Sequence, residues 1–298
     1  MRLLYAISIT SLKKYYGKTR GLENASLDVK EGEIYGFVGP NGSGKTTLTR
    51  ILLGLIHSTS GEAKIFDQDV TKASVLLNRQ IGYLPSEAFF FPEMKVKDVF
   101  RFFQEMRKVD DSRIVELVKR FDIDMNKTMD QLSFGNKKKV GIVVALLHNP
   151  KLLILDEPTT GLDPLMQQIF LDLLVEEKKK GVTVFLSSHI LSEVEKVCDR
   201  VALIRDGIIY QVFEMNDIAQ LENKKVSLFP SLEGELPDGM TFLKEEDGLS
   251  HYSYIGDINS LLKRLSGQTF EKCNIRDASL EEIFIQYYQK EGATNDVL

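Results

Sequence analysis

Residues Gly39 to Thr46 have the residue types and spacing of a phosphate-binding loop. Three glycines precede the Lys45-Thr46 pair, so the segment fits the pattern G-x-x-x-x-G-K-[ST]. Small residues let successive backbone N–H groups converge on phosphate oxygens, and Lys45 reaches outward from the turn. A helix beginning here adds about half a positive charge at its N-terminus. We therefore predict that this loop binds nucleotide phosphates, with contacts from Gly39, Pro40, Asn41, Gly42, Ser43, Gly44, Lys45, Thr46 and Thr47.

Two adjacent carboxylates, Asp156 and Glu157, follow an apolar run from Leu152 to Leu155. Successive side chains of a strand point to opposite sides, so the two carboxylates can have different tasks. Asp156 is placed to accept hydrogen bonds from the water shell of a Mg²⁺ ion that Thr46 holds. Glu157 is placed to orient or deprotonate an attacking water. The alternative is that both residues simply begin a solvated loop.

The elements around these residues follow an α/β pattern. Apolar strands are expected near Leu3–Ile9, Ala25–Lys30, Ile34–Val38, Ala63–Phe66, Gln80–Leu84, Lys151–Asp156, Val182–Ser187 and Arg200–Arg205. Helices are expected over Thr46–Ile56, Gly135–His148, Pro164–Lys180 and Ile190–Val197. Alternating strands and helices indicate a parallel sheet whose ligands bind at the carboxyl ends of its strands.

Two further segments differ from this pattern. The stretch from about 86 to 148 is mainly helical, with apolar residues at three- and four-residue spacing over Val96–Lys108 and Ser112–Phe121. The last eighty-odd residues resemble a small α+β unit, with strands such as Lys225–Phe229 and helices over Ile258–Leu265 and Ser279–Tyr288. We therefore predict a main domain over residues 1–218 with a helical insert, and an accessory domain over residues 219–298.

Composition is that of an ordinary folded domain in a reducing compartment. The chain has a net charge of −5, which gives no electrostatic reason to expect nucleic-acid binding. Its two cysteines lie far apart in sequence, which argues against a disulfide scaffold. No run of about twenty apolar residues occurs, so a membrane role would need another subunit.

The order of the motifs resembles that of the nucleotide-binding subunits of ATP-binding cassette (ABC) transporters. Beside the glycine loop and the Asp156-Glu157 pair, the resemblance rests on Leu132–Asn136, Thr160–Pro164 and Ser187–His189. It covers roughly Leu3 to Val212. The resemblance implies a P-loop ATPase fold with a helical subdomain, and it implies ATP and Mg²⁺ as the cofactors.

The resemblance also implies roles for residues outside the glycine loop. In this family two cassettes close head to tail, and Ser133 and Gly135 would here contact the ATP held by the partner. Asp163 would communicate between the two half-sites, although it also suits a helix N-cap before Pro164. His189 would bridge the γ-phosphate and Glu157, so that Lys45, Glu157 and His189 form the catalytic set.

The chain departs from the usual family pattern at three positions. Phe134 replaces a glycine and Asn136 replaces a glutamine in the signature segment, while Ser133 and Gly135 are retained. Ser86 stands where the family commonly has a glutamine that approaches Mg²⁺. A serine is shorter and could act through water, so we expect a changed geometry at this metal position. The alternative is an ordinary loop residue.

Several aromatic and charged residues admit two interpretations. Tyr16 resembles the aromatic residue that stacks on adenine, with Tyr15 as the rival and an ordinary strand aromatic as the alternative. Phe89 to Phe91 lie between two prolines and are either core residues or part of a docking patch for a partner. The run Lys137–Lys139 is expected to be a solvated helix face rather than a nucleic-acid contact.

The sequence therefore predicts the ATP-hydrolysing subunit of an ABC transporter, energising transport through a separate membrane-spanning permease. Similarity of the C-terminal segment to drug- and peptide-exporting members favours export of a drug, peptide or lipid-like compound. The expected assembly is a homodimer or a heterodimer with another such ATPase, peripheral on the cytoplasmic face of the cell membrane. The alternatives are a soluble or regulatory ABC ATPase that is not coupled to transport, and a P-loop kinase.

Overall fold

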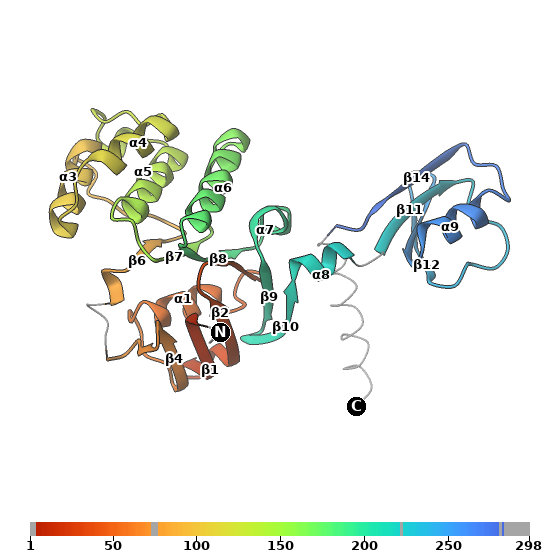
Figure 1. The fold of residues 1–298 in the computed structure, drawn as a ribbon, viewed down its shortest axis with the longest axis horizontal. Helices are drawn as coiled ribbons and strands as arrows, with labels where there is room; N and C mark the ends of the chain where they lie inside the picture. The colour runs from red at the N-terminus through yellow and green to blue at the C-terminus, as the bar shows by residue number, and fades with distance from the viewer. Residues whose placement is uncertain (1–3, 73–76, 221–222, 280–281, 283–298) are drawn as a thin grey trace. The chain divides into compact units, whose positions relative to one another are not determined.

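The computed structural model describes residues 4–72, 77–220, 223–279 and 282, with the side chains of residues 218–220 not described. The chain forms two compact units, Met1–Glu214 and Met215–Leu298, and Figure 1 shows their elements. Unit 1 contains the phosphate loop and the carboxylate pair. The helix predicted over Ser279–Tyr288 lies outside the described residues, apart from Ser279 and Glu282.

Unit 1 is built on a ten-stranded sheet with the order β5-β4-β1-β2-β10-β9-β3-β8-β7-β6. Strands β9, β3, β8, β7 and β6 run parallel, whereas β1, β2, β4 and β5 pair antiparallel. This mixed α/β architecture confirms the predicted fold class. The strands are β1 (Tyr5–Tyr16), β2 (Thr19–Lys30), β3 (Ile34–Val38), β4 (Ser60–Ile65), β5 (Gln68–Asp69), β6 (Ile81–Leu84), β7 (Leu152–Asp156), β8 (Thr183–Ser188), β9 (Arg200–Arg205) and β10 (Ile208–Glu214).

Strand β3 is buried on both faces, which explains its unbroken apolar composition. Tyr35 and Phe37 point into the core that also holds Leu48 of helix α1 (Lys45–Leu52). Gly36 points to the other face, where an added Cβ would lie 2.7 Å from Val194 of helix α7 (Leu191–Val197). Burying one such apolar side chain contributes about 1.5–3 kcal/mol, so this packing fixes the strand that leads into the phosphate loop.

The first two strands are longer than predicted, and this changes the position of Tyr15 and Tyr16. The sequence places both tyrosines between strands, but β1 extends to Tyr16 and pairs with β2 to its end. The sequence does not predict this extension because the pairing register of β1 and β2 shifts, which breaks the alternation of apolar and polar residues. One shift lies between Ile9 and Leu12, where Ser11 has φ 46°. Tyr16 therefore ends a strand and pairs with Thr19 across a tight turn.

The helical part of unit 1 lies beside β6 and β7 (Figure 1). It contains α3 (Val96–Arg107), α4 (Ser112–Phe121), the 3₁₀ turn η1 (Met129–Gln131) and α5 (Phe134–Leu146). Helix α5 packs closely on β6, since a Cβ on Gly82 would lie 2.1 Å from the carbonyl oxygen of Ala145. Among the described residues, every helix is too short or too polar to cross a membrane.

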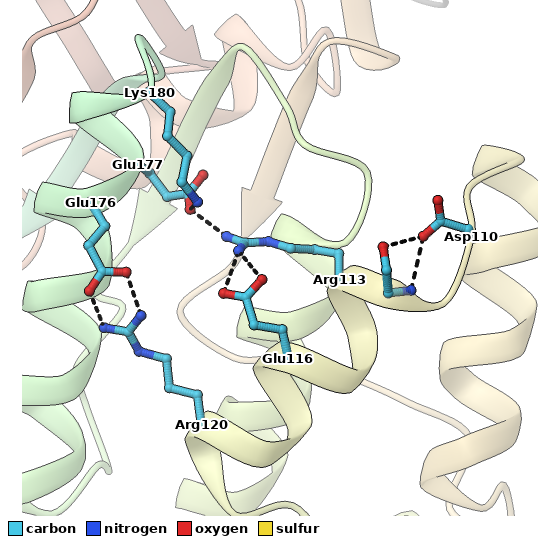
Figure 2. A network of polar contacts seen from close by, with 8 residues as sticks. Asp110, Arg113, Glu116, Arg120, Glu176, Glu177 and Lys180 are labelled. Carbon is cyan, nitrogen blue, oxygen red and sulfur yellow. Dashed lines mark hydrogen bonds and ion pairs between the residues drawn. The ribbon is translucent and has the colours of Figure 1, made fainter.

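A network of ion pairs joins α4 to α6 (Pro164–Lys179), as Figure 2 shows. Arg113 and Glu177 are both buried and form an ion pair, and Lys180 lies 2.8 Å from the same carboxylate. Arg120 makes a bidentate contact with Glu176, at 2.6 and 2.8 Å. Because α6 packs against β8, this network attaches the helical part to the sheet.

Unit 2 has a four-stranded antiparallel sheet with the order β12-β13-β11-β14. Its elements are α8 (Met215–Gln220), β11 (Asn223–Phe229), β12 (Met240–Glu246), β13 (Leu249–Ile255), α9 (Ile258–Leu265) and β14 (Lys272–Asp277). Helix α9 has the predicted bounds and packs Leu261 and Leu265 onto the inward side chains of β11 and β13. Strand β14 was not expected, because its alternating pattern contains only one half-buried apolar side chain, Ile275.

Candidate functional site

The glycine loop joins β3 to α1, and its backbone requires glycine at several positions. Gly42 and Gly44 have φ of 79° and 110°, a region that side chains with a Cβ rarely adopt. A Cβ on Gly39 would lie 2.1 Å from the carbonyl oxygen of Ile204. The loop is therefore held against β9 while its N–H groups lead into the N-terminus of α1, as a phosphate-binding loop requires.

Lys45 is folded over the loop. Its Nζ donates to the carbonyl oxygens of Gly39 and Pro40, at 2.6 and 3.2 Å, and lies 3.5 Å from Oε1 of Glu157. The sequence predicts a lysine reaching outward, but the side chain is only 6% exposed and a buried ammonium needs acceptors nearby. These partners keep the lysine charge between the loop and Glu157.

Asp156 ends β7 and is 1% exposed. One of its carboxylate oxygens accepts from Oγ1 of Thr46 at 3.0 Å, and the other accepts from Oγ of Ser187 at 2.5 Å. The structure thus brings together two of the three residues that sequence analysis assigns to the metal position, whereas Ser86, within the described residues, makes no hydrogen bond with either of them. Ser187, at the end of β8, was not among the predicted site residues.

Glu157 stands in a strained backbone conformation, with φ 49°. Such a conformation costs about 1–3 kcal/mol and persists only where its surroundings hold it. Its N–H donates to the carbonyl oxygen of Ser187 at 3.0 Å, and Oε2 lies 2.6 Å from Nδ1 of His189. The structure therefore brings Glu157 and His189 into contact, and the two carboxylates have different partners: Glu157 contacts Lys45 and His189, whereas Asp156 contacts Thr46 and Ser187.

A second contact steadies the loop after Glu157. Thr159 donates its hydroxyl to Oε2 of Glu193 at 2.5 Å, and both residues are buried. Burial raises the pKa of Glu193, whereas the hydrogen bond from Thr159 opposes that rise. Because Glu193 belongs to α7, the segment after β8 touches the carboxylate loop at both His189 and Glu193.

A cavity of about 390 Å³ lies in front of the glycine loop. The predicted residues that line it are Tyr16, Asn41, Gly42, Gly44, Lys45, Thr46, Thr47, Ser86 and Glu157. Gly39, Pro40 and Ser43 belong to the loop but do not line this cavity. The volume and lining suit a ligand that extends from Tyr16 to Glu157 across the phosphate loop.

Only one of the two candidate tyrosines faces this cavity. Tyr16 is 45% exposed and lines it, and Nζ of Lys14 lies 5.0 Å from the centre of its ring. Tyr15 instead donates its hydroxyl to Glu23, and that hydrogen bond raises the pKa of the tyrosine. The geometry therefore favours Tyr16 over Tyr15 as a stacking surface.

Sequence analysis did not predict Thr19, Arg20 and Gly21, which line the same cavity. Strand pairing places them there, since Thr19 pairs with Tyr16. A Cβ on Gly21 would lie 3.0 Å from the Tyr16 ring and 3.1 Å from Thr47, so glycine lets the aromatic ring approach α1. A hairpin assignment over Tyr16–Thr19 would have revealed these residues.

Ser86 lines the cavity, and its carbonyl oxygen has an unexpected donor from α5, Lys138. Lys138 donates its Nζ to the carbonyl oxygens of Pro85 and Ser86, at 3.1 and 2.8 Å. It is 1% exposed, and burial lowers its pKa to about 8. The prediction of a solvated lysine face is therefore wrong at this position, because α5 packs this face against the loop after β6.

Ser133, Gly135 and Asp163 do not line the cavity. Ser133 caps α5 by accepting from the N–H of Asn136 at 3.4 Å, and Asp163 caps α6 by accepting from the N–H of Met166 at 3.0 Å. A Cβ on Gly135 would lie 2.3 Å from the carbonyl oxygen of Gly161, so the two predicted segments touch each other. They form a separate exposed surface of unit 1.

Comparison with known families gives one match over the site. The sequence model of the ABC transporter family matches residues 22–160. Among curated proteins, the bacitracin transport ATP-binding protein of Bacillus licheniformis is 32% identical over 299 residues, covering 94% of this chain and 96% of that protein. The lantibiotic transport ATP-binding protein of Streptococcus pyogenes is 36% identical over 219 residues, covering 72% of this chain and 94% of that protein.

Solved structures agree with this assignment. One, described as the ATP-binding subunit of an ABC transporter, is 28% identical, with a TM-score of 0.67, and covers 72% of this chain and 92% of its own. Another is a dimeric ATP-binding cassette in a post-hydrolysis state with ADP and Pi. It is 25% identical, with a TM-score of 0.62, over 70% of this chain and 98% of its own. The chain belongs to the ATP-binding subunits of ABC transporters, and it is a nucleotide-binding P-loop ATPase.

Proposed function

We propose that the cavity of unit 1 binds Mg²⁺-ATP and that Glu157 promotes attack of water on the γ-phosphate. The observation that carries this proposal is the meeting of Lys45 and Glu157 at the cavity wall, 3.5 Å apart, with His189 outside the lining and 2.6 Å from the same Glu157 carboxylate. Tyr16 stacks on the base, and the loop from Gly39 to Thr47 holds the phosphates.

The donor set around Thr46 suits Mg²⁺. Within the described residues no group of three or more His, Cys, Asp or Glu side chains could hold a metal ion. Mg²⁺ commonly uses one or two protein oxygens, several waters and substrate phosphates, so the Thr46 hydroxyl and the Asp156 carboxylate are sufficient. Ser86, at the cavity wall, would act through water. The ion would neutralise charge that develops on the phosphates.

The catalytic residues have separate tasks in this proposal. Glu157 accepts a hydrogen bond or proton from the attacking water, and its strained backbone directs the carboxylate toward the cavity. His189 holds Oε2 of Glu157 and orients it. Lys45 offsets the negative charge of the ATP phosphates, so that the Glu157 carboxylate can remain ionised beside them.

We propose that two cassettes close over the nucleotides, as a homodimer or with a related subunit. Support comes from Ser133 and Gly135 at the N-terminus of α5, where backbone N–H groups can meet a phosphate, and from the fact that neither residue lines this chain's own cavity. Asp163 lies on the same surface. A structural relative is a dimeric ATP-binding cassette bound to ADP and Pi.

The chain, in our proposal, energises a separate membrane-spanning permease and lies at the cytoplasmic face of the cell membrane. The bacitracin-transport relative aligns over 94% of this chain, so the similarity includes unit 2. The names of that relative and of the lantibiotic-transport relative favour export of peptide, drug or lipid-like compounds. Unit 2 would serve as an accessory domain.

The permease would dock on the aromatic patch formed by Phe89, Phe90, Phe91, Phe102 and Phe103. Phe89 and Phe91 are 85% and 78% exposed, and the patch borders a hollow of about 160 Å³ that includes Met94. Exposed aromatic side chains gathered around a hollow are typical of interaction surfaces. Phe89 to Phe91 follow closely after Ser86 in the chain, and Ser86 lines the nucleotide cavity. A permease bound to this patch would therefore contact a segment that begins at the cavity wall.

Glu157→Gln tests the proposed chemistry. The amide keeps the size of the side chain but cannot accept a proton, so kcat for ATP hydrolysis should fall by at least about 100-fold while the Kd for ATP stays within about threefold. The measurements are phosphate release and binding of a fluorescent ATP analogue by the full chain. Gel filtration with ATP should show a dimer, trapped because the nucleotide is not hydrolysed.

Glu195→Gln on α7 is the matched control. Glu195 is an exposed carboxylate on the helix that carries Glu193, and it does not line the cavity. This variant should hydrolyse ATP like wild type. Wild-type turnover by Glu157→Gln would contradict the assignment of the catalytic carboxylate.

A further inference from the structure

Lys138 is a buried cation that the proposed chemistry does not use. Its ammonium has two main-chain acceptors, on Pro85 and Ser86, and within the described residues it has no carboxylate partner in an ion pair. Burying an ammonium is costly, so a lysine in this place must offset its desolvation through these contacts and the nearby negative charges of Asp156 and Glu157.

Lys138 joins helix α5 to the Pro85-Ser86 turn, and these two segments differ in their relation to the nucleotide cavity. Ser86 lines the nucleotide cavity together with Glu157. Lys138 belongs to α5, whose N-terminus carries Ser133 and Gly135 on the surface outside that cavity. One side chain therefore connects the wall of the chain's own cavity to the helix whose beginning faces elsewhere.

Close packing extends this connection along α5. Lys138, Gly141 and Ala145 lie on one helix face, since residues three and four apart are neighbours. An added Cβ on Gly141 would lie 2.9 Å from Leu84, immediately before the Pro85-Ser86 turn, and 3.3 Å from Ala88, two residues after it. The turn is thus held by apolar contacts on both sides and by the lysine at its centre.

We propose that Lys138 is a positioning residue for ATP hydrolysis. Its ammonium fixes the Pro85-Ser86 turn to α5, so that Ser86 keeps its place at the cavity wall and α5 moves only together with that turn. This inference rests on the proposed function, because Ser86 and Ser133 matter only if ATP binds and two cassettes close. Removing the ammonium leaves the carbonyl oxygens of two half-buried residues without their lysine donor and loosens the turn.

Lys138→Met tests the inference, because methionine keeps most of the apolar stem and removes the three N–H donors. The full chain should show kcat for ATP hydrolysis reduced by about tenfold, with KM for ATP within about twofold of wild type, since the phosphate loop is untouched. In the Glu157→Gln background, Lys138→Met should also weaken the ATP-dependent dimer measured by gel filtration.

Lys137→Met and Lys139→Met are the matched controls. They remove the same group from the two neighbouring positions of α5, where the side chains are half-buried and make no hydrogen bond or ion pair with the described residues. Both controls should have wild-type kcat, KM and dimerisation. A value of kcat for Lys138→Met within twofold of wild type, or a raised KM with unchanged kcat, would overturn the inference.

Lys138→Gln guards against a failure of Lys138→Met to fold, which thermal unfolding would reveal. The shorter amide keeps a donor, so its kcat should fall between those of wild type and Lys138→Met. If Lys138→Met is unfolded, Lys138→Gln decides: a kcat reduced more than twofold at unchanged KM supports the inference, and wild-type kinetics overturn it. Absence of ATP hydrolysis by the wild-type chain would instead count against the proposed function.

Discussion

At the scale of single residues, the site depends on groups held in conformations or environments that they would not adopt alone. Glu157 has a left-handed backbone, Lys45 is folded over its loop, and Lys138 is buried without a carboxylate in an ion pair among the described residues. Glu157 and Lys138 are stabilised by neighbours from distant parts of the sequence, and Lys45 is held by its own loop and by Glu157. Such over-determined positions are typical of functional sites, where strain is offset by surrounding structure.

Tyr16→Ala should weaken ATP binding without removing the chemistry. Stacking of a base on an aromatic ring is worth about 1–3 kcal/mol, which corresponds to roughly 5- to 150-fold in Kd. Tyr15→Phe is the control, because it removes only the hydrogen bond to Glu23 and should leave Kd within about twofold. Titration with a fluorescent ATP analogue measures both. Equal losses in the two variants would argue against Tyr16 as the stacking residue.

At the scale of elements, the connection between α4 and α6 links the helical part to the sheet. Its two ion pairs, which Figure 2 shows, differ in burial. Arg113 and Glu177 are 8% and 3% exposed at their side chains, whereas Arg120 and Glu176 are 24% and 46% exposed. The two Arg–Glu ion pairs should therefore contribute very differently to the free energy of unfolding.

Arg113→Met should lower the free energy of unfolding by about 3 kcal/mol, the low end for breaking a buried pair, because Lys180 still contacts Glu177. Arg120→Met should cost at most about 1 kcal/mol, since water solvates the remaining Glu176. Urea titrations followed by circular dichroism compare the two variants. A larger loss from Arg120→Met would show that burial does not decide the contribution of these pairs.

At the scale of the whole molecule, the chain combines a nucleotide cavity with two outer surfaces, which we propose bind a second cassette and a permease. The cavity is lined by much of the phosphate loop and by Glu157, while Asp156 and His189 contact the lining residues Thr46 and Glu157. The surface with Ser133 and Gly135 lies outside it, which is the arrangement expected if each chain supplies half of two sites. The functions of both outer surfaces stay predictions.

Replacing Phe89 and Phe91 together by serine should uncouple ATP hydrolysis from transport. Both side chains are mostly exposed, so the fold and the ATPase activity of the isolated chain should change less than twofold. In the assembled transporter, export of the substrate should fall at least about tenfold, because exposed aromatics commonly dominate binding at interfaces. Leu55→Ser, at an exposed residue in another part of unit 1, is the control. Normal transport by the double variant would remove the docking assignment.

The sequence by itself determined the α/β class, the phosphate loop, the carboxylate pair and the family. These depend on local patterns: glycines where the backbone turns, an apolar strand ending in Asp156 and Glu157, and a fixed order of motifs. Only the tertiary structure decided which tyrosine faces the cavity, that Thr19, Arg20 and Gly21 join it, and that Lys138 is buried. Those facts depend on strand register, on a bulge near Ser11 and on the packing of α5 against β6. Neighbours of this kind are distant in sequence, so local patterns do not reveal them.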